Sequence, residues 1–291
     1  DNGEMAVDTL VEDDDDTYYV DANGVMVRNQ WVAIENEDAG EDDEPDNYWY
    51  YFQSNGKAYK RSDSASSDAI NAKVINGKKY AFDQYGAMTA EWSLDKDEIT
   101  DKASSSNPIP ASNSSAGSVD VDAKYAQQWR YFNSVEDGSR VSKGWFKVVP
   151  GYYLHESKYE DDADYWYYAN GDGNIIADRV KKIKGKTYAF DNYGRMISGL
   201  ALIQYSTTSD GDGQIIAKIA DDDDNPYDTE DNFNETAMKK IAKELADGSY
   251  RFMYFGGADD GSMKTGRQTI DLDGESFSFK FETKSNIKGA G

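Results

Sequence analysis

The sequence predicts an all-β fold: a solenoid of β-hairpin repeats with acidic loop insertions and one short helix near residues 235–246. The first supporting observation is a phrase that occurs twice, at residues 75–88 and 183–196. Each copy places an Asn-Gly or Lys-Gly turn before the alternating strand Tyr-Ala-Phe, and a second turn, Asp-x-Tyr-Gly, after it. This is the pattern of a β-hairpin. Because a single hairpin cannot bury its apolar face alone, a hairpin that recurs along a chain indicates a repeat architecture.

The second observation is that the order of the neighbouring elements is also kept twice. A Trp is followed by an acidic insertion, by a run of Tyr and Trp, and then by the repeated phrase. These elements are Trp31, residues 35–47 and residues 48–52 in the first copy, and Trp145, residues 156–164 and residues 165–168 in the second. A duplication of roughly 110 residues is the simplest account of this ordered match.

A change in composition separates the two copies. Residues 104–118 are rich in Ser and also contain Asn and Pro, which is the composition of a flexible linker or a long loop. We therefore expect a first aromatic-repeat module at residues 1–103 and a second at residues 119–291. The second module also contains a helix-bearing insertion and a degenerate third copy of the repeat.

The short helix is predicted from the spacing of apolar residues in the stretch 234–245. They recur at positions 237, 238, 241, 242 and 245, the intervals of one helix face. We expect Asn234 to cap the N-terminus of this helix and Gly248 to end it. The chain then returns to aromatic strands at residues 250–255 and 277–281, which form the third copy.

Composition restricts the possible partners. Asp and Glu number 55 against 31 Lys and Arg, so the formal net charge is −24. Such a field repels nucleic acid and anionic lipid but is compatible with a neutral glycan. Aromatic residues make up 13% of the chain, with 22 Tyr, so Tyr must do much of the packing that Leu and Ile do elsewhere. The chain has no Cys, hence no disulfide, and no apolar run of membrane-spanning length. Residues 1–10 lack the pattern of a signal peptide, so we expect any such peptide to have been removed or never present.

A family resemblance is clearest in the third copy. It reads Gly-Ser-Met-Lys-Thr-Gly at 261–266, Gln-Thr-Ile at 268–270, then Gly274 and an aromatic strand. This resembles the aromatic repeats of Gram-positive surface proteins, the cell-wall-binding and glucan-binding repeat family that includes choline-binding modules and the YG repeats of glucansucrases. The two copies of the phrase and the Tyr-Trp runs at 48–52 and 165–168 resemble the same family. The resemblance covers most of residues 17–92 and 125–203, and residues 250–291.

The resemblance implies a secreted or cell-surface bacterial protein whose stacked hairpins display aromatic cages or platforms. Members of the family bind choline, α-glucans or other carbohydrate of the cell surface. The choline-binding type has a Gly-Trp step at each junction between hairpins. Here only Gly144 and Trp145 form that step, whereas Gln30 precedes Trp31 and Gly199 precedes Leu200. A continuous series of choline cages is therefore not expected from the sequence.

The candidate ligand-binding residues are aromatic. An exposed indole can cover the C–H face of a pyranose while nearby polar groups bind the hydroxyls, and aromatic faces also attract a quaternary ammonium. We expect Trp31 to pair with Trp49, and Trp145 with Trp166, because an acidic insertion lengthens the loop beside each pair. The alternative is that these rings fill the gaps between hairpins as core residues. The full set of candidates is Trp31, Trp49, Tyr51, Trp92, Trp145, Trp166 and Tyr168, with Trp129 as a further ring and the turn residues Tyr85 and Tyr193 as weaker members.

Other chemistry has less support in the sequence. Tyr80, Phe82, Tyr188 and Phe190 alternate along their strands, so we expect each pair to face the core. Calcium could bind the acidic turns at 170–174 and 210–214, although neither matches an EF-hand loop, and we predict no metal ligands and no cofactor. The single His, the absence of Cys and the absence of a Gly-x-Ser-x-Gly motif argue against an enzyme.

Three functions remain open at this level. The first is a non-catalytic carbohydrate-binding module of a secreted bacterial protein, which binds an α-glucan such as starch, maltooligosaccharide or dextran on Trp and Tyr platforms at hairpin junctions. The second is an anchor that binds choline or another component of the bacterial cell wall. The third is a structural spacer or adhesion module whose aromatic rings all belong to the core. The expected partner is a neutral polysaccharide or the cell wall, with no nucleic acid and no membrane insertion.

Overall fold

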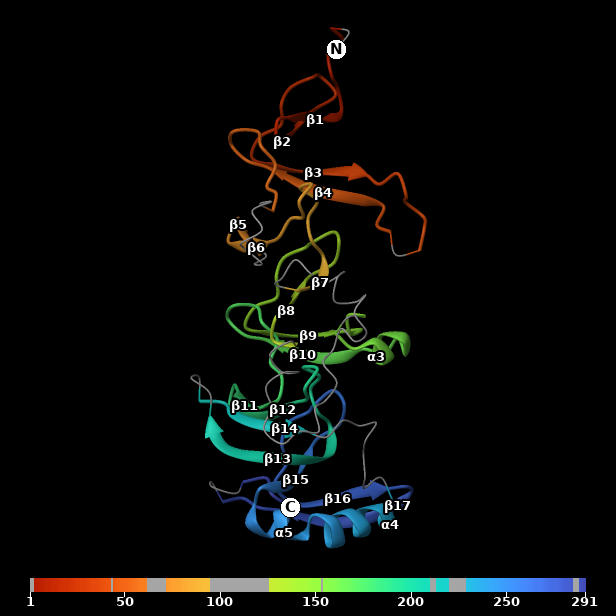
Figure 1. The fold of residues 1–291 in the computed structure, drawn as a ribbon, viewed down its shortest axis with the longest axis vertical. Coiled ribbons are helices and arrows are strands. Elements are labelled where there is room, and N and C mark those ends of the chain that lie inside the picture. The colour runs from red at the N-terminus through yellow and green to blue at the C-terminus, as the bar shows by residue number, and fades with distance from the viewer. Residues whose placement is uncertain are drawn as a thin grey trace. The chain divides into compact units, whose positions relative to one another are not determined.

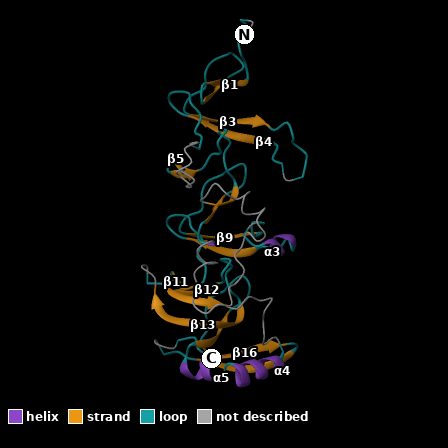
Figure 2. Cartoon of the chain, viewed as in Figure 1, coloured by secondary structure: helices purple, strands orange, loops and turns teal. Residues whose placement is uncertain are grey.

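A computed structural model describes residues 3–42, 44–61, 72–94, 126–152, 154–209, 213–219, 229–284 and 288–291. Small antiparallel sheets dominate these residues and helices are few, so the predicted all-β hairpin fold is confirmed (Figures 1 and 2). The described chain divides into two compact units, the first holding β1 to β8 and the second β9 to β17 with the helices. No helix in this part of the chain is long and apolar enough to cross a membrane.

The first unit consists of four two-stranded antiparallel sheets. The pairs are β1 (Thr9–Asp13) with β2 (Asp16–Val20), β3 (Gln30–Glu35) with β4 (Asn47–Phe52), β5 (Lys73–Ile75) with β6 (Lys78–Tyr80), and β7 (Glu91–Leu94) with β8 (Trp129–Phe132). The predicted linker at 104–118 lies outside the described residues. Its flanks, however, belong to one hairpin, because β7 pairs with β8 across it.

The second unit contains a larger sheet as well as hairpins. β9 (Gly144–Val148) pairs with β10 (Tyr165–Ala169), and β16 (Gly266–Leu272) pairs with β17 (Glu275–Phe281). Between them lies a five-stranded sheet in the order β12-β11-β14-β13-β15, made of β11 (Arg179–Ile183), β12 (Lys186–Phe190), β13 (Gly199–Ser209), β14 (Ile215–Ile219) and β15 (Tyr250–Phe255). The repeat pattern does not predict this sheet, because β13 and β14 come from the stretch where the pattern breaks.

The helical region near residue 240 is longer and less regular than the sequence predicts. It comprises α4 (Glu230–Phe233), the π-helical segment η2 (Asn234–Lys240) and α5 (Ala242–Asp247). Thr229, not Asn234, caps the start, since its hydroxyl accepts a hydrogen bond from the backbone N–H of Asn232 at 3.1 Å. The predicted end is confirmed, because Gly248 adopts a left-handed conformation with φ 82°. A further helix, α3 (Glu156–Glu160), lies in the second acidic insertion and was not predicted.

Successive hairpins within each unit are joined by one repeated contact. The Phe in each repeated phrase forms a β-bridge with the Met of the Gly-x-Met turn that follows it, as Phe82 does with Met88 and Phe190 with Met196. That Met then joins the hairpin to the preceding one, because its backbone N–H donates to a Trp carbonyl there. The bonds are from Met196 to Trp166 and from Met88 to Trp49, both at 2.8 Å. Each hairpin is thus hydrogen-bonded to an earlier one in the same unit, which is the stacking of a solenoid.

The Met side chain of this turn then packs against a glycine of a later turn. Met26 lies against Gly56 and Met88 against Gly138 in the first unit, while Met196 lies against Gly261 in the second. A side chain on any of these glycines would overlap with the Met, so glycine is required both for the turn conformation and for the close approach.

The core follows the same repeat. Phe52, Phe132, Phe190, Phe255 and Phe281, each at the end of its strand, are completely buried. Phe52, Phe190, Phe255 and Phe281 each belong to a separate buried cluster, so the core is divided among the hairpins.

Candidate functional site

The second unit holds an aromatic cluster centred on Trp145. Its indole makes edge-to-face contacts with Tyr168 at 5.1 Å and 71° and with Tyr188 at 4.8 Å and 64°, measured between ring centroids. It stacks on Phe190 at 5.6 Å and 28°. One half-buried indole is therefore packed against a stacked Phe ring and two roughly perpendicular Tyr rings. We call Trp145, Tyr168, Tyr188 and Phe190 the second aromatic cluster.

The first unit repeats this arrangement around Trp31. The corresponding contacts are with Tyr51 at 5.2 Å and 68°, with Tyr80 at 4.9 Å and 63°, and with Phe82 at 5.8 Å and 28°. We call Trp31, Tyr51, Tyr80 and Phe82 the first aromatic cluster. Every centroid distance agrees with its counterpart in the second cluster within about 0.2 Å, so the duplication seen in the sequence extends to side-chain geometry.

Strand register explains why these residues meet. Trp145 lies directly opposite Tyr168 in the β9–β10 pair, and Trp31 lies opposite Tyr51 in the β3–β4 pair. Directly opposite side chains on one face are in contact range, so each pair forms as soon as its hairpin closes. The remaining rings come from the next hairpin, whose residues alternate so that both face the same Trp.

The residues predicted to be core behave largely as expected. Tyr80, Phe82 and Phe190 are buried, while Tyr188 is half-buried. Burial raises the pKa of Tyr188, with a smaller contribution from the nearby carboxylate of Asp260. Sequence reasoning treated Tyr80 and Tyr188 only as core, but each also forms a wall of its cluster.

Trp166 extends the second cluster. Its ring meets Trp145 at 6.3 Å and 87°, so the predicted pairing of these two indoles is observed. Trp166 donates its Nε1–H to Asp259 at 3.0 Å, and the ammonium of Lys147 lies 5.9 Å from its ring centroid. Lys147 also contacts Asp259, at 2.9 Å. These two contacts hold the pKa of Asp259 below its usual value, and the carboxylate in turn raises the pKa of Lys147.

The expected pairing of Trp31 with Trp49 differs from that of Trp145 with Trp166. Among the described residues no ring contact joins these two indoles, and Trp49 lies half-buried opposite Ala33 in the β3–β4 register. In the second copy the residue opposite Trp166 is Lys147. The Lys could have been noticed in the sequence, because it follows Trp145 by two residues and a strand places such residues on one face.

A third ring contact lies in the β7–β8 hairpin. Trp92 meets Tyr131 at 5.3 Å and 74° and Trp129 at 6.3 Å and 81°. Trp129 is only 2% exposed, so it belongs to the core, while Trp92 is half-buried. This hairpin therefore repeats the edge-to-face contacts with a different set of rings.

None of the six Trp side chains, all of which lie in the described ranges, is exposed; five are half-buried and Trp129 is buried. The turn residue Tyr85 is 68% exposed, as expected from its position. Tyr193, its counterpart, is instead half-buried and stacks on the single His, His155, at 3.8 Å and 13°. Five of the predicted indoles are thus partly exposed, and Trp31, Trp92, Trp145 and Trp166 make edge-to-face contacts with neighbouring rings.

The two calcium candidates differ in what the structure describes. Residues 210–212 of the second turn lie outside the described ranges. In the first turn Asn170 accepts a hydrogen bond from the backbone N–H of Asn174 at 3.0 Å, which closes the turn. Within the described residues no group of three or more His, Asp or Glu is placed to hold a metal ion.

Comparisons with known proteins give matches only among solved structures. No protein-family model matches the chain, and no match was found among curated proteins. The structure of CbpJ from Streptococcus pneumoniae matches with a TM-score of 0.35 and 15% identity over 97% of this chain and 92% of that one. A modular endolysin of phage Cp-1, solved with choline, matches with a TM-score of 0.30 and 19% identity over 68% of this chain and 39% of that one.

The modular autolysin LytC of Streptococcus pneumoniae matches with a TM-score of 0.32 and 15% identity. The match covers 100% of this chain and 50% of the autolysin, so this chain spans about half its length. All three TM-scores are below 0.5 and all three identities are below 20%, so these matches assign the chain neither a family nor a ligand.

Proposed function

We propose that this chain is a binding module of a bacterial cell-surface protein that holds quaternary ammonium groups, such as that of choline, on its two aromatic clusters. The observation that carries the proposal is the Trp145 arrangement, one indole with roughly perpendicular Tyr rings, and its near-identical repetition around Trp31. In an edge-to-face contact the ring that presents its edge keeps its own faces free of that neighbour, and an aromatic face that no other group covers attracts a cation.

The charge of the chain supports a cationic ligand. A net charge of −24 raises the local concentration of cations and gives a neutral glycan no comparable advantage. Phosphocholine-bearing polymers or other cell-wall components with exposed trimethylammonium groups are the class of partner that this field and these rings would select together.

Ammonium groups already lie beside the aromatic rings. Lys147 lies over Trp166 at 5.9 Å, Lys181 over Tyr168 at 5.8 Å, and in the first unit Lys73 lies over Tyr59 at 5.8 Å. Lys73 and Lys181 occupy equivalent positions, opposite Tyr80 and Tyr188 in their hairpins. These lysines support the view that the ring faces are electrostatically suited to a cation.

The α-glucan interpretation has less support in the geometry. A pyranose needs a flat, exposed aromatic face, and every Trp of the chain is buried or half-buried. Binding to starch, maltooligosaccharide or dextran would therefore count against the proposal. The absence of catalysis and an extracellular location at the bacterial surface are parts of the same proposal.

The test is a titration with choline chloride against sodium chloride at equal ionic strength, because a chain of this charge also responds to salt alone. We expect choline, and not sodium, to change the Trp fluorescence. We expect Tyr168→Leu to weaken choline binding at its site by about fivefold, since removal of one aromatic ring costs on the order of 1 kcal/mol of cation–π attraction. The matched control is Tyr85→Leu, in an exposed turn outside both clusters. Retention on insoluble starch combined with no response to choline would overturn the proposal.

A further inference from the structure

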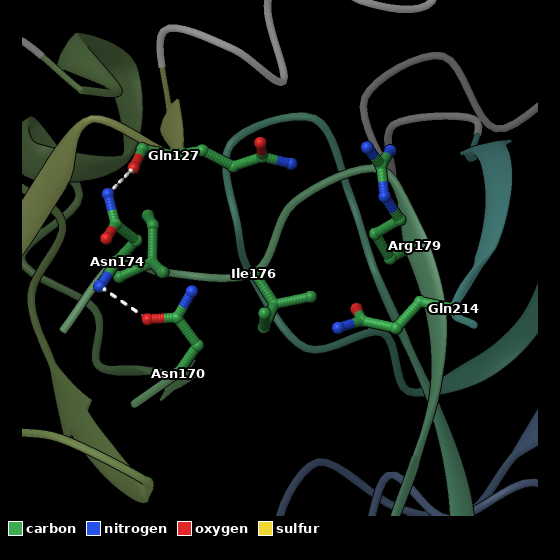
Figure 3. A pocket seen from close by; sticks show the side chains of 7 residues that line it. Gln127, Asn170, Asn174, Ile176, Arg179 and Gln214 are labelled. Carbon is green, nitrogen blue, oxygen red and sulfur yellow. Dashed lines mark hydrogen bonds between the residues drawn. The ribbon is translucent and has the colours of Figure 1, made fainter. Parts of the chain in front are cut away.

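A polar pocket lies in the second unit (Figure 3). Its volume is about 170 Å³. Four carboxamide side chains, one guanidinium and two apolar side chains line it: Gln127, Asn170, Asn174, Gln214, Arg179, Ile175 and Ile176. Ile176 belongs to the same hydrophobic cluster as Phe190, and Trp145 and Tyr168 pack against that cluster.

Hydrogen bonds fix the positions of the polar groups. The turn after β10 is closed by the backbone N–H of Asn170, which donates to the carbonyl of Asn174 at 2.9 Å. The Asn174 carboxamide donates to the carbonyl of Gln127 at 2.5 Å, and Gln127 donates to the carbonyl of Ala177 at 3.3 Å. Figure 3 shows these side chains converging from separate segments of the chain. A lining held in this way needs little reorganisation when a ligand enters.

The other side of the pocket is built on the five-stranded sheet. Arg179 begins β11 and Gln214 directly precedes β14, and the two strands pair there, with Arg179 opposite Ile216. Both side chains are 8% exposed, and the Arg179 guanidinium is anchored by a hydrogen bond to the carbonyl of Asp178 at 2.9 Å. The sheet that the repeat pattern does not predict thus supplies half of this site.

The chemistry of the lining differs from that of the rest of the chain. Arg179 carries the only charge among the described lining residues, and none of them is a carboxylate, in a chain with 55 Asp and Glu. A guanidinium repels a cation, so this pocket does not suit the ligand proposed for the aromatic clusters. Carboxamides offer both a donor and an acceptor, which matches hydroxyl and acetamido groups.

The volume restricts the ligand further. A protein cavity of about 150 Å³ accommodates benzene, a six-membered ring. The pocket is slightly larger at about 170 Å³ and has an apolar surface at Ile176, against which the C–H face of a ring can lie. The pocket can therefore hold one six-membered ring, while the substituents of a sugar such as an N-acetylhexosamine would extend through its open side.

We infer that this pocket binds a single uncharged pyranose unit, of the N-acetylhexosamine type, through the carboxamides and Arg179. It is a site separate from the aromatic clusters and goes beyond the proposed function. A glycan that carries both a cationic group and such a sugar would engage the chain at two neighbouring points.

The experiment is a titration followed by backbone amide chemical shifts, with N-acetylglucosamine and glucosamine as matched probes under conditions where the free amine is protonated. The two sugars share a ring and differ by an acetyl group and a charge. We expect N-acetylglucosamine to shift the amides of the pocket residues, and glucosamine to bind at least tenfold more weakly because of Arg179. This experiment needs only the wild-type protein. The inference would be overturned if N-acetylglucosamine shifted none of the pocket amides, or if the two sugars bound equally well.

Variants locate the site within the chain. Gln214→Leu keeps the approximate volume and removes one carboxamide, and we expect it to weaken N-acetylglucosamine binding by about five- to tenfold. The matched control is Gln204→Leu, the same change at an exposed position of β13, which should have no effect. Equal affinities for Gln214→Leu and wild type, with the fold intact by circular dichroism, would contradict the inference. Choline titration of the same samples distinguishes this result from a failure of the proposed function.

Discussion

Asp191 and Asp83 occupy the same turn position in two repeats but have different surroundings. Each accepts hydrogen bonds at Oδ1 from the backbone amides two and four residues further on, at 3.0 and 2.8 Å for Asp191 and at 2.8 and 2.9 Å for Asp83. Only Asp191 also binds a cation, since its Oδ2 accepts from Arg195 Nε at 2.7 Å. The side chains of that pair are 0% and 3% exposed. The repeats therefore provide a natural comparison between a buried ion pair and the same turn without one.

Replacing each Asp by Asn tests this difference. An Asn oxygen can still accept both backbone hydrogen bonds, so we expect Asp83→Asn to cost less than about 1 kcal/mol. Asp191→Asn removes the carboxylate that the buried guanidinium of Arg195 contacts at 2.7 Å, which costs about 3–5 kcal/mol. For a unit of 150 to 250 residues this corresponds to a fall in Tm of about 6–20 °C, at about 2–4 °C per kcal/mol.

Differential scanning calorimetry of the two variants and the wild-type chain measures the difference. The expected result is a large downward shift of one transition for Asp191→Asn and a small effect for Asp83→Asn. Equal losses for the two variants, or losses that differ by less than about 1 kcal/mol, would refute the view that the buried pair stabilises the second unit.

Three further outcomes follow from the contacts. Lys147→Met should tighten choline binding beside Trp166 by about threefold. The reason is that the ammonium groups of Lys147 and choline, about 7 Å apart in water, repel each other by about 0.6 kcal/mol. Weaker choline binding by the variant in the fluorescence titration would contradict this. The carboxyl group of Asp259 should titrate below its ordinary value of 3.8, so its contact with Lys147 stabilises the chain above about pH 4 and is lost as the pH falls below that; carbon-detected NMR should show the midpoint rising in the Lys147→Met variant. Gly261→Ala should lower the free energy of unfolding in urea by about 2–4 kcal/mol, because Gly261 has a φ of +58° and an added Cβ would overlap with Met196. Adding Met196→Ala should restore the part of this loss that the overlap causes. No restoration would show that the turn conformation alone causes the loss.

Much of the architecture was predictable because it depends on local pattern. The two copies of the phrase close into the β5–β6 and β11–β12 hairpins, since an Asn-Gly or Lys-Gly turn and alternating side chains specify a hairpin without distant contacts. The repeat order likewise predicted that Trp145 and Trp166 lie together. The end of the helical segment at Gly248 was predictable because a glycine in the left-handed conformation ends a helix locally.

What could not be predicted depends on contacts between distant segments. β7 and β8 pair across residues 95–128, and β14 pairs with both β11 and β13, so no short window of sequence contains these sheets. How far the indoles are buried could not be predicted for the same reason, because Trp31 and Trp145 contact rings from the following hairpin. The pocket could not be predicted from the sequence because its carboxamides come from separate segments. They form a lining only where the turn after β10 lies against the five-stranded sheet.

The most direct test of the central claim is the stoichiometry of choline binding by isothermal titration calorimetry. The two aromatic clusters predict two sites per chain, a loss of one in Trp31→Ala and of the other in Trp145→Ala, and no binding in the double variant, with each variant folded by circular dichroism. The contradicting result is a chain that binds no choline, or whose choline binding survives the double variant.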